Sequence, residues 1–228
     1  MKSIILLHGA IGASDQLYPL SLELKSKGYE CFTLDFSGHG AKSFTNGFGI
    51  AAFSSELESF IESNNLKQPH VFGYSMGGFV ALYLASKRHD LIGRIITLGT
   101  KFEWSPEIAA KEIKMLDSQT ISEKVPKFAE ALQKRHGDKW KLLLKSTAEM
   151  MLELGKNNAL TEEEFAKISN HVLLGLAEND SMVSVEETNF AASKIKNSQR
   201  FELKEAKHPI ETVSTKHLAE LINQFIEA

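Results

Sequence analysis

The residues best placed to do chemistry are a serine and the small residues around it. The run Gly73-Tyr74-Ser75-Met76-Gly77-Gly78 follows a strand-like segment and leads into an apolar helical pattern. A side chain at such a sharp strand-to-helix turn is pushed outward on a strained backbone, and it needs small residues two positions to either side. The G-x-S-x-G spacing in this context predicts that Ser75 is a nucleophile.

A serine hydroxyl is a weak nucleophile, so a histidine must take its proton and an acid must orient that histidine. Among the eight histidines, His208 follows the last strand-like segment and precedes Pro209, which predicts a loop at the same sheet edge as Ser75. Competing histidines fall in or beside predicted helices or in a glycine turn: His39, His89, His136 and His217. We therefore expect His208 to be the base.

The candidate acid lies in the segment Gly175-Leu176-Ala177-Glu178-Asn179-Asp180, after the penultimate strand-like run. Asp180 is the best candidate, Glu178 is the runner-up, and Glu103 is a more distant third. The chain order is then nucleophile, acid and base, as in one of the known serine triad arrangements.

A second loop, Leu7-His8-Gly9-Ala10, ends the first strand-like run. If the first and third strands are neighbours, this loop faces Ser75 at the edge where parallel sheets bind ligands. The backbone N–H groups of Ala10 and Met76 would then form a two-donor oxyanion hole. We expect His8 to be a structural histidine that braces this loop.

These loops need a sheet to position them. Short apolar runs alternate with helical patterns, which predicts βαβ units and a mostly parallel sheet between two helical layers. The predicted strands cover residues 3–7, 29–35, 70–74, 94–98, 171–176 and 200–203. The sequence therefore predicts a three-layer α/β/α fold.

About 70 residues without a strand interrupt the alternation, far more than an ordinary connection requires. We predict a helical cap over residues 101–170, with the remaining core formed by residues 1–100 and 171–228. Its apolar stripes include one formed by Val125, Phe128, Ala129 and Leu132. The cap residues expected to line an apolar substrate pocket are Trp104, Met115, Trp140 and Met150.

Composition excludes several classes of protein. The 228 residues carry a formal net charge of -3, without the basic surplus of a nucleic-acid binder. No apolar run approaches the roughly 20 residues of a membrane span, and the run from Ile4 to Leu7 is too short for a secretory signal core. The single cysteine, Cys31, fits a reducing compartment, so we expect a cytoplasmic protein.

Together, the His8-Gly9 turn, the segment 35–43, the serine turn and the loops of Asp180 and His208 resemble the α/β-hydrolase family over essentially the full chain. The resemblance implies a Ser75, Asp180 and His208 triad with an Ala10 and Met76 oxyanion hole. Many family members carry two further strands before the His-Gly strand, so it implies a sheet of about six strands here. No metal or organic cofactor is implied, because metal-ligand spacing and a dinucleotide glycine fingerprint are missing.

The expected function is hydrolysis of a small-molecule carboxylic ester through an acyl-serine intermediate. The serine turn also looks like that of menaquinone-pathway lyases, cofactor-free haloperoxidases and carbon–carbon hydrolases. The lyases usually continue with arginine, where this chain has Phe79. A hydrolase-fold binding protein that has lost turnover is the alternative from a different class.

Overall fold

The computed structural model describes residues 2–45 and 47–228, and the first residue of the predicted core, Met1, lies outside them together with Asn46. Its centre is a six-stranded sheet in the order β2-β1-β3-β4-β5-β6, with every neighbouring pair parallel. The strands are β1 (Lys2–Leu7), β2 (Tyr29–Leu34), β3 (His70–Tyr74), β4 (Ile95–Leu98), β5 (Val172–Asn179) and β6 (Ser198–Lys207). The predicted α/β fold with a parallel sheet of about six strands is confirmed.

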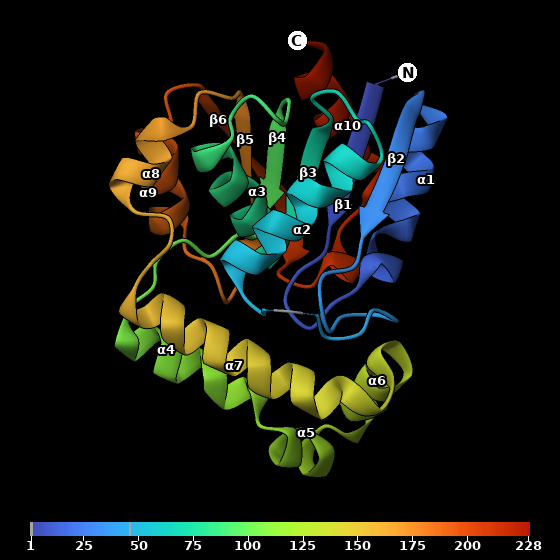
Figure 1. Cartoon of the computed structure of the whole chain (residues 1–228), viewed down its shortest axis with the longest axis vertical. Helices are drawn as coiled ribbons and strands as arrows, with labels where there is room; N and C mark the ends of the chain where they lie inside the picture. Colours follow the sequence, from blue (N-terminus) through green and yellow to red (C-terminus); the bar gives the residue numbers. More distant parts are fainter. Residues whose placement is uncertain (1, 46) are drawn as a thin grey trace.

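Helices cover both faces of the sheet, and further helices lie beyond the carboxyl ends of its strands (Figure 1). On the core they are η1 (Ser14–Leu17), α1 (Tyr18–Ser26), α2 (Ile50–Ser63), α3 (Met76–Lys87), α8 (Glu162–Lys167), α9 (Val185–Lys194), η4 (Ile210–Thr212) and α10 (Thr215–Glu227). A separate layer consists of α4 (Pro106–Glu112), η2 (Ile113–Leu116), α5 (Ser118–Lys124), α6 (Pro126–His136), η3 (Gly137–Lys139) and α7 (Trp140–Lys156). We call this second set the cap layer.

The consecutive apolar residues of β1 serve two different cores. Ile5 and Leu7 pack under α2 and α3, whereas Ile4 and Leu6 pack under α1 and α10. All four side chains are fully buried, and burying each contributes about 1.5–3 kcal/mol relative to an exposed position. A run without polar alternation is therefore what a strand covered on both faces requires.

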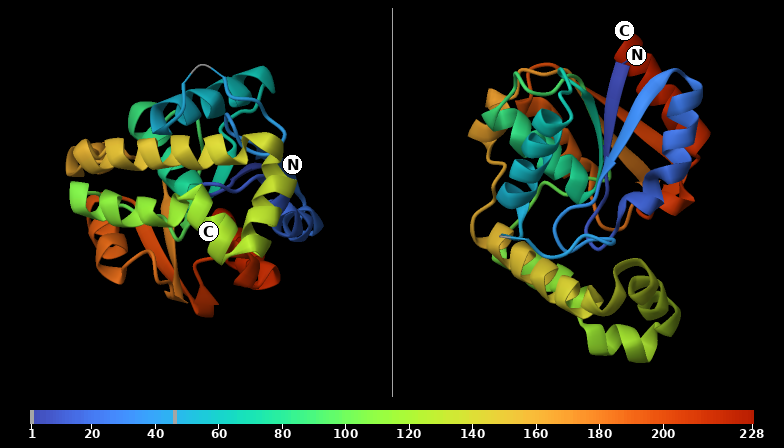
Figure 2. Two further views of the ribbon diagram at one scale, coloured as in Figure 1. Left: turned by 90° about the horizontal axis from the view of Figure 1, so that it is seen from below. Right: turned by 45° about the vertical axis from the view of Figure 1, so that its right-hand side comes forward.

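The cap layer lies beyond the carboxyl ends of the strands, with α4 and α7 side by side across them (Figures 1 and 2). The predicted segment 101–170 also includes α8, which lies with the core helices instead. Phe165 of α8 is buried against Phe102, and Glu164 pairs with Lys87 of α3 at 2.6 Å. The cap layer thus ends before α8, because α8 packs on α3 and α9 of the core and buries Phe165 there.

One end of the cap layer is fastened to two core loops by a buried histidine. His136 accepts a hydrogen bond from the Gly40 N–H at Nδ1 (3.0 Å), and its Nε2–H donates to the Ile11 carbonyl (2.9 Å). Beside it, Lys139 Nζ donates to the Gly40 carbonyl at 2.6 Å. A single helix end therefore connects the loops that follow β1 and β2.

Next to this attachment, His8 is fully buried and holds the first loop as a neutral group. Its Nε2 accepts from the Phe36 N–H (3.2 Å), and its Nδ1–H donates to the Gly9 carbonyl (2.8 Å). Burial lowers the pKa of His8 to about 4. The adjacent His39, 4.7 Å away between ring centroids, also has a pKa well below its usual value because it is buried. His8 is thus structural, as expected.

Within the described residues, no helix is both long enough and apolar enough to cross a membrane.

Buried neutral histidines make stability depend on pH. The unfolded chain protonates His8 near pH 6.5 but the folded chain only near 4, so this contribution is complete above pH 6.5 and is lost as the pH falls. Between pH 7 and pH 5, His8 alone should lower the free energy of unfolding by about 2 kcal/mol. Urea unfolding of the wild type and of His8→Gln should show a shallower pH dependence in the variant.

The matched control is His217→Gln, because His217 is exposed on α10. That variant should follow the wild-type pH dependence. Parallel curves for the wild type and His8→Gln would contradict the assigned role of the buried imidazole.

Candidate active site

Ser75 stands between β3 and α3 in a backbone conformation that few residues adopt, with φ 52° and ψ −116°. Its neighbours permit this turn because they lack side chains. A Cβ on Gly73 would lie 2.4 Å from the Gly78 nitrogen, and one on Gly77 would lie 2.5 Å from the Leu7 carbonyl oxygen. The close approach of three backbone segments therefore fixes the position from which Ser75 points outward.

Two hydrogen bonds hold the serine backbone against the next strand. The Ser75 N–H donates to the Leu98 carbonyl at 2.8 Å, and the Thr100 hydroxyl donates to the Ser75 carbonyl at 3.0 Å. Thr100 did not emerge from the sequence as part of the site. Its position in the sequence could have indicated this role, because Thr100 lies two residues after β4, which pairs with β3.

His208 and Asp180 come from the loops after β6 and β5 and contact each other directly. The distance between His208 Nδ1 and Asp180 Oδ2 is 2.8 Å, and the Asp180 side chain is almost fully buried. Its other oxygen, Oδ1, accepts from the N–H groups of Met182 (2.8 Å) and Val183 (2.9 Å). This arrangement places a proton on Nδ1 and leaves His208 Nε2 free to accept one.

The same contacts keep Asp180 ionised. Burial by itself raises the pKa of this carboxyl, but the hydrogen bond and charge interaction with His208 and the two backbone donors outweigh it. The pKa of Asp180 therefore lies below its usual value. A carboxylate in this state fixes the tautomer of His208 and stabilises it when it becomes charged.

Two further core residues fit closely around this pair. Gly99 has φ +61°, and a Cβ there would lie 3.3 Å from both Asp180 Oδ2 and His208 Nδ1. The buried Tyr74 hydroxyl donates to the His208 carbonyl at 3.0 Å, and burial raises the pKa of this phenol. Tyr74 therefore remains a donor that anchors the histidine loop.

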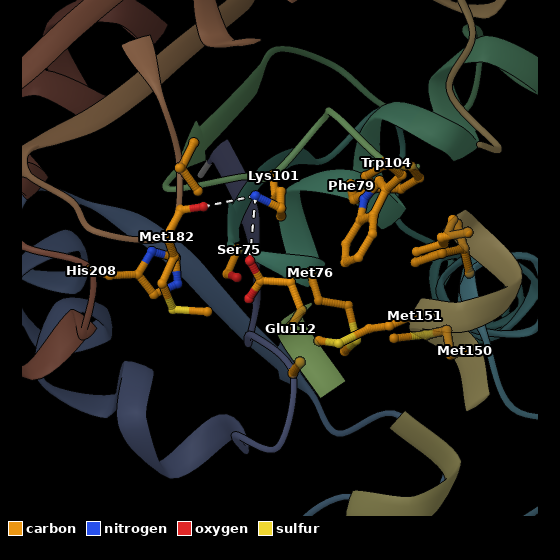
Figure 3. A pocket seen from close by; sticks show the side chains of 14 residues that line it. Ser75, Met76, Phe79, Lys101, Trp104, Glu112, Met150, Met151, Met182 and His208 are labelled. Atoms are coloured by element: carbon orange, nitrogen blue, oxygen red, sulfur yellow. Dashed lines mark hydrogen bonds and ion pairs between the residues drawn. The ribbon is translucent and has the colours of Figure 1, made fainter. Parts of the chain in front are cut away.

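Ser75 and His208 border the same pocket (Figure 3). Among the described residues, Ser75 Oγ and His208 form no hydrogen bond. In enzymes without bound substrate, such a contact is often long and shortens only when the substrate binds. The lining residues are Ala10, Ile50, Ser75, Met76, Phe79, Lys101, Trp104, Glu112, Met150, Met151, Leu154, Met182, Val183 and His208. The pocket thus joins the serine turn, the histidine loop and the cap layer.

Ala10 and Met76, the residues of the predicted oxyanion hole, both lie beside Ser75 at the pocket. β1 and β3 are neighbours, and a Cβ on Gly9 would lie 3.2 Å from Ser75 Cβ, so the Ala10 loop presses against the serine. Both residues line the pocket. Neither backbone N–H donates to another residue in the described parts of the chain, which leaves both free for a ligand oxygen.

The other candidate acids lie away from the histidine. Glu178 is exposed, contacts Lys204 at 3.0 Å and accepts from the Glu205 N–H at 2.8 Å. Glu103 is also exposed, and its N–H donates to Glu187. Only Asp180 among the three sequence candidates contacts His208.

The structure separates the four predicted cap residues. Trp104 and Met150 line the pocket, but Met115 is 55% exposed and Trp140 is buried in a different cluster, with Ile121, Leu132 and Leu144. Placing Met115 and Trp140 on the pocket was therefore wrong. An apolar residue in a thin layer can face solvent or the layer's own core instead of the ligand.

Among residues 2–45 and 47–228, no group of three or more His, Cys, Asp or Glu side chains is arranged to hold a metal ion.

Known proteins resemble this chain in part of its sequence or in its fold. A curated 2-succinyl-6-hydroxy-2,4-cyclohexadiene-1-carboxylate synthase from Yersinia pestis is 28% identical over 98 residues, which is 42% of this chain and 35% of that protein. The matched stretch thus spans about a third of the curated relative.

Solved structures match over the whole chain. An enol-lactonase from Burkholderia xenovorans LB400 has a TM-score of 0.80 at 18% identity, covering 100% of this chain and 92% of that one. A thermophilic esterase from Thermogutta terrifontis, with malate bound, has a TM-score of 0.80 at 17% identity, covering 100% and 90%. The family model for the alpha/beta hydrolase fold matches residues 2–156. By this match, and by the sheet and loops described above, the chain belongs to the alpha/beta hydrolase fold family.

Proposed function

We propose that the protein is a serine hydrolase that cleaves a small or medium carboxylic ester through an acyl-serine intermediate. The observation that carries this proposal is the 2.8 Å contact of His208 with the buried Asp180, at the edge of a pocket that Ser75 also lines. A nucleophile, a base and an orienting acid are the minimum for this chemistry.

In the first half of the reaction, Ser75 Oγ attacks the ester carbonyl while His208 Nε2 takes the hydroxyl proton. Asp180 stabilises the imidazolium through Nδ1. The Ala10 and Met76 N–H groups receive the developing oxyanion, and donors in this role typically contribute about 3–4 kcal/mol each to transition-state stabilisation. His208 then protonates the departing alcohol.

In the second half, water hydrolyses the acyl-serine. His208 Nε2 removes a proton from water, the hydroxide adds to the acyl carbonyl, and the same N–H groups hold the oxyanion. Collapse of the tetrahedral intermediate releases the carboxylic acid, and His208 returns the proton to Ser75. No external cofactor is needed for these steps.

The pocket walls support an ester with an apolar portion. Trp104, Met150 and Met151 line it, and flexible thioether side chains adapt to acyl chains of different shapes. The enol-lactonase with a similar fold points in the same direction, since a lactone is a cyclic ester.

A second candidate is an elimination like that catalysed by the menaquinone-pathway lyases. The 98-residue match to the curated synthase favours it. Against it stands Phe79, which lines the pocket where those lyases usually carry an arginine for an acidic substrate. Carbon–carbon hydrolases and cofactor-free haloperoxidases would use the same three residues, so a substrate panel has to separate them.

We further propose a cytoplasmic location and a small-molecule substrate. The lone Cys31, which cannot form a disulfide within this chain, supports a reducing compartment.

Ser75→Ala should abolish both ester turnover and covalent labelling by a fluorophosphonate, because the attacking oxygen is gone. Turnover is measured on p-nitrophenyl esters of increasing chain length, and labelling is measured by intact-mass spectrometry. The control Ser193→Ala changes an exposed serine on α9 and should label like the wild type. Esterase activity that survives in Ser75→Ala, or a folded wild type that does not label, would point to a binding protein or to different chemistry.

Asp180→Asn should lower kcat/KM by about 10³- to 10⁴-fold, because an amide no longer enforces the required histidine tautomer. The matched control is Glu178→Gln, two residues earlier and directed toward Lys204. That control should retain wild-type kcat/KM. Equal losses in the two variants would contradict the assignment of Asp180 as the acid.

A further inference from the structure

Besides Ser75 and His208, two ionic side chains of opposite charge interrupt the apolar wall of the pocket. Lys101 lies in the loop after β4, and Glu112 is the last residue of α4 in the cap layer. Their Nζ and Oε1 atoms are 3.6 Å apart, and the side chains are only 18% and 8% exposed. Figure 3 shows both at the pocket with Ser75. A charged pair at this location needs a reason, because taking charges out of water is costly.

Lys101 also contacts two other groups of the core. Its Nζ donates to the Met182 carbonyl at 2.9 Å and lies 4.0 Å from Glu187. Glu187 accepts three hydrogen bonds from backbone N–H groups of the core, at 2.7–2.9 Å. It is therefore a structural carboxylate whose hydrogen bonds go to the backbone of the core, and Glu112 is the carboxylate nearer to the lysine.

Glu112 differs sharply from Glu187. Its contact with Lys101 is longer than a hydrogen bond, and within the described residues it accepts no hydrogen bond from protein. A buried carboxylate can accept several hydrogen bonds and is unfavourable without them. Glu112 thus offers unused acceptor capacity to whatever occupies the pocket, beside the donor Nζ of Lys101.

The charges around this position select the kind of group that fits. A carboxylate on the substrate would be attracted to Lys101 but repelled by Glu112 and Glu187. An ammonium group would be attracted to Glu112 and Glu187 but repelled by Lys101, and it could not accept a hydrogen bond from the lysine. A hydroxyl both donates and accepts, so it satisfies Glu112 and Lys101 together without adding a charge.

We propose that Lys101 and Glu112 form a subsite that recognises a hydroxyl group on an otherwise apolar ester. The apolar part contacts Phe79, Trp104 and the methionines, while the hydroxyl lies between the two charged side chains. This assignment rests on the proposed esterase function of Ser75. It names a substrate class: hydroxylated esters, in preference to unsubstituted or carboxylated ones.

Two substrate series test the subsite on either side of the scissile bond. The acyl series compares the p-nitrophenyl esters of butyrate, 3-hydroxybutyrate and succinate, the last with a free carboxylate. The alcohol series compares pentyl butyrate with 4-hydroxybutyl butyrate by pH-stat. The hydroxylated ester should have kcat/KM about 10-fold or more above its unsubstituted partner in one series. Equal values in both series would overturn the subsite.

Glu112→Gln should change the order of preference, because it leaves Lys101 without its opposing charge in the pocket. The ratio of kcat/KM for the succinate ester to that for the butyrate ester should rise about 10-fold or more over the wild type. Each ratio is taken within one variant, so a loss of folded protein cancels. The control Glu107→Gln removes an exposed carboxylate from the same helix and should keep the wild-type ratio.

The outcomes separate the two proposals. Hydrolysis of butyrate esters without a hydroxyl preference, and with an unchanged succinate ratio in Glu112→Gln, overturns the subsite and leaves the esterase proposal standing. A wild type that hydrolyses none of these esters and does not react with a fluorophosphonate overturns both.

Discussion

The close contact between the turn at Ser75 and the end of β1 is the constraint on which the site depends. Gly77 packs against the Leu7 carbonyl, so β1, β3 and α3 meet without side chains between them. This contact brings the Ala10 loop next to the serine and directs the start of α3 at the same point. The strain at Ser75 is tolerated because the surrounding sheet and helix hold the turn from several sides.

The core was predictable from the sequence because its signals are local. Buried strands are visible in the sequence as runs of apolar residues, and the turn at Ser75 requires glycines at fixed positions. Asp180 could be preferred to Glu178 only by its place in a loop, and the deciding fact is spatial: Glu178 turns toward Lys204 on the neighbouring β6, while Asp180 contacts His208.

The cap layer was less predictable because an apolar stripe does not say which surface covers it. Val125 and Phe128, which share a stripe with the buried Leu132, are 51% and 40% exposed. Trp140 fills the layer's own core, and the stripe pattern could not distinguish that from the pocket. No sequence pattern indicated that Lys101 and Glu112 would meet, because their contact depends on how α4 crosses the end of the sheet.

The attachment of His136 to the core gives the cap layer a second role beyond shaping the pocket. Its bond to the Ile11 carbonyl fixes the residue next to Ala10, and its bond to Gly40 fixes the neighbouring loop. The cap layer is therefore not an interchangeable module. Grafting a cap that lacks an equivalent of His136 would remove both hydrogen bonds and leave the backbone beside Ala10 without this support, even though the core itself was unchanged.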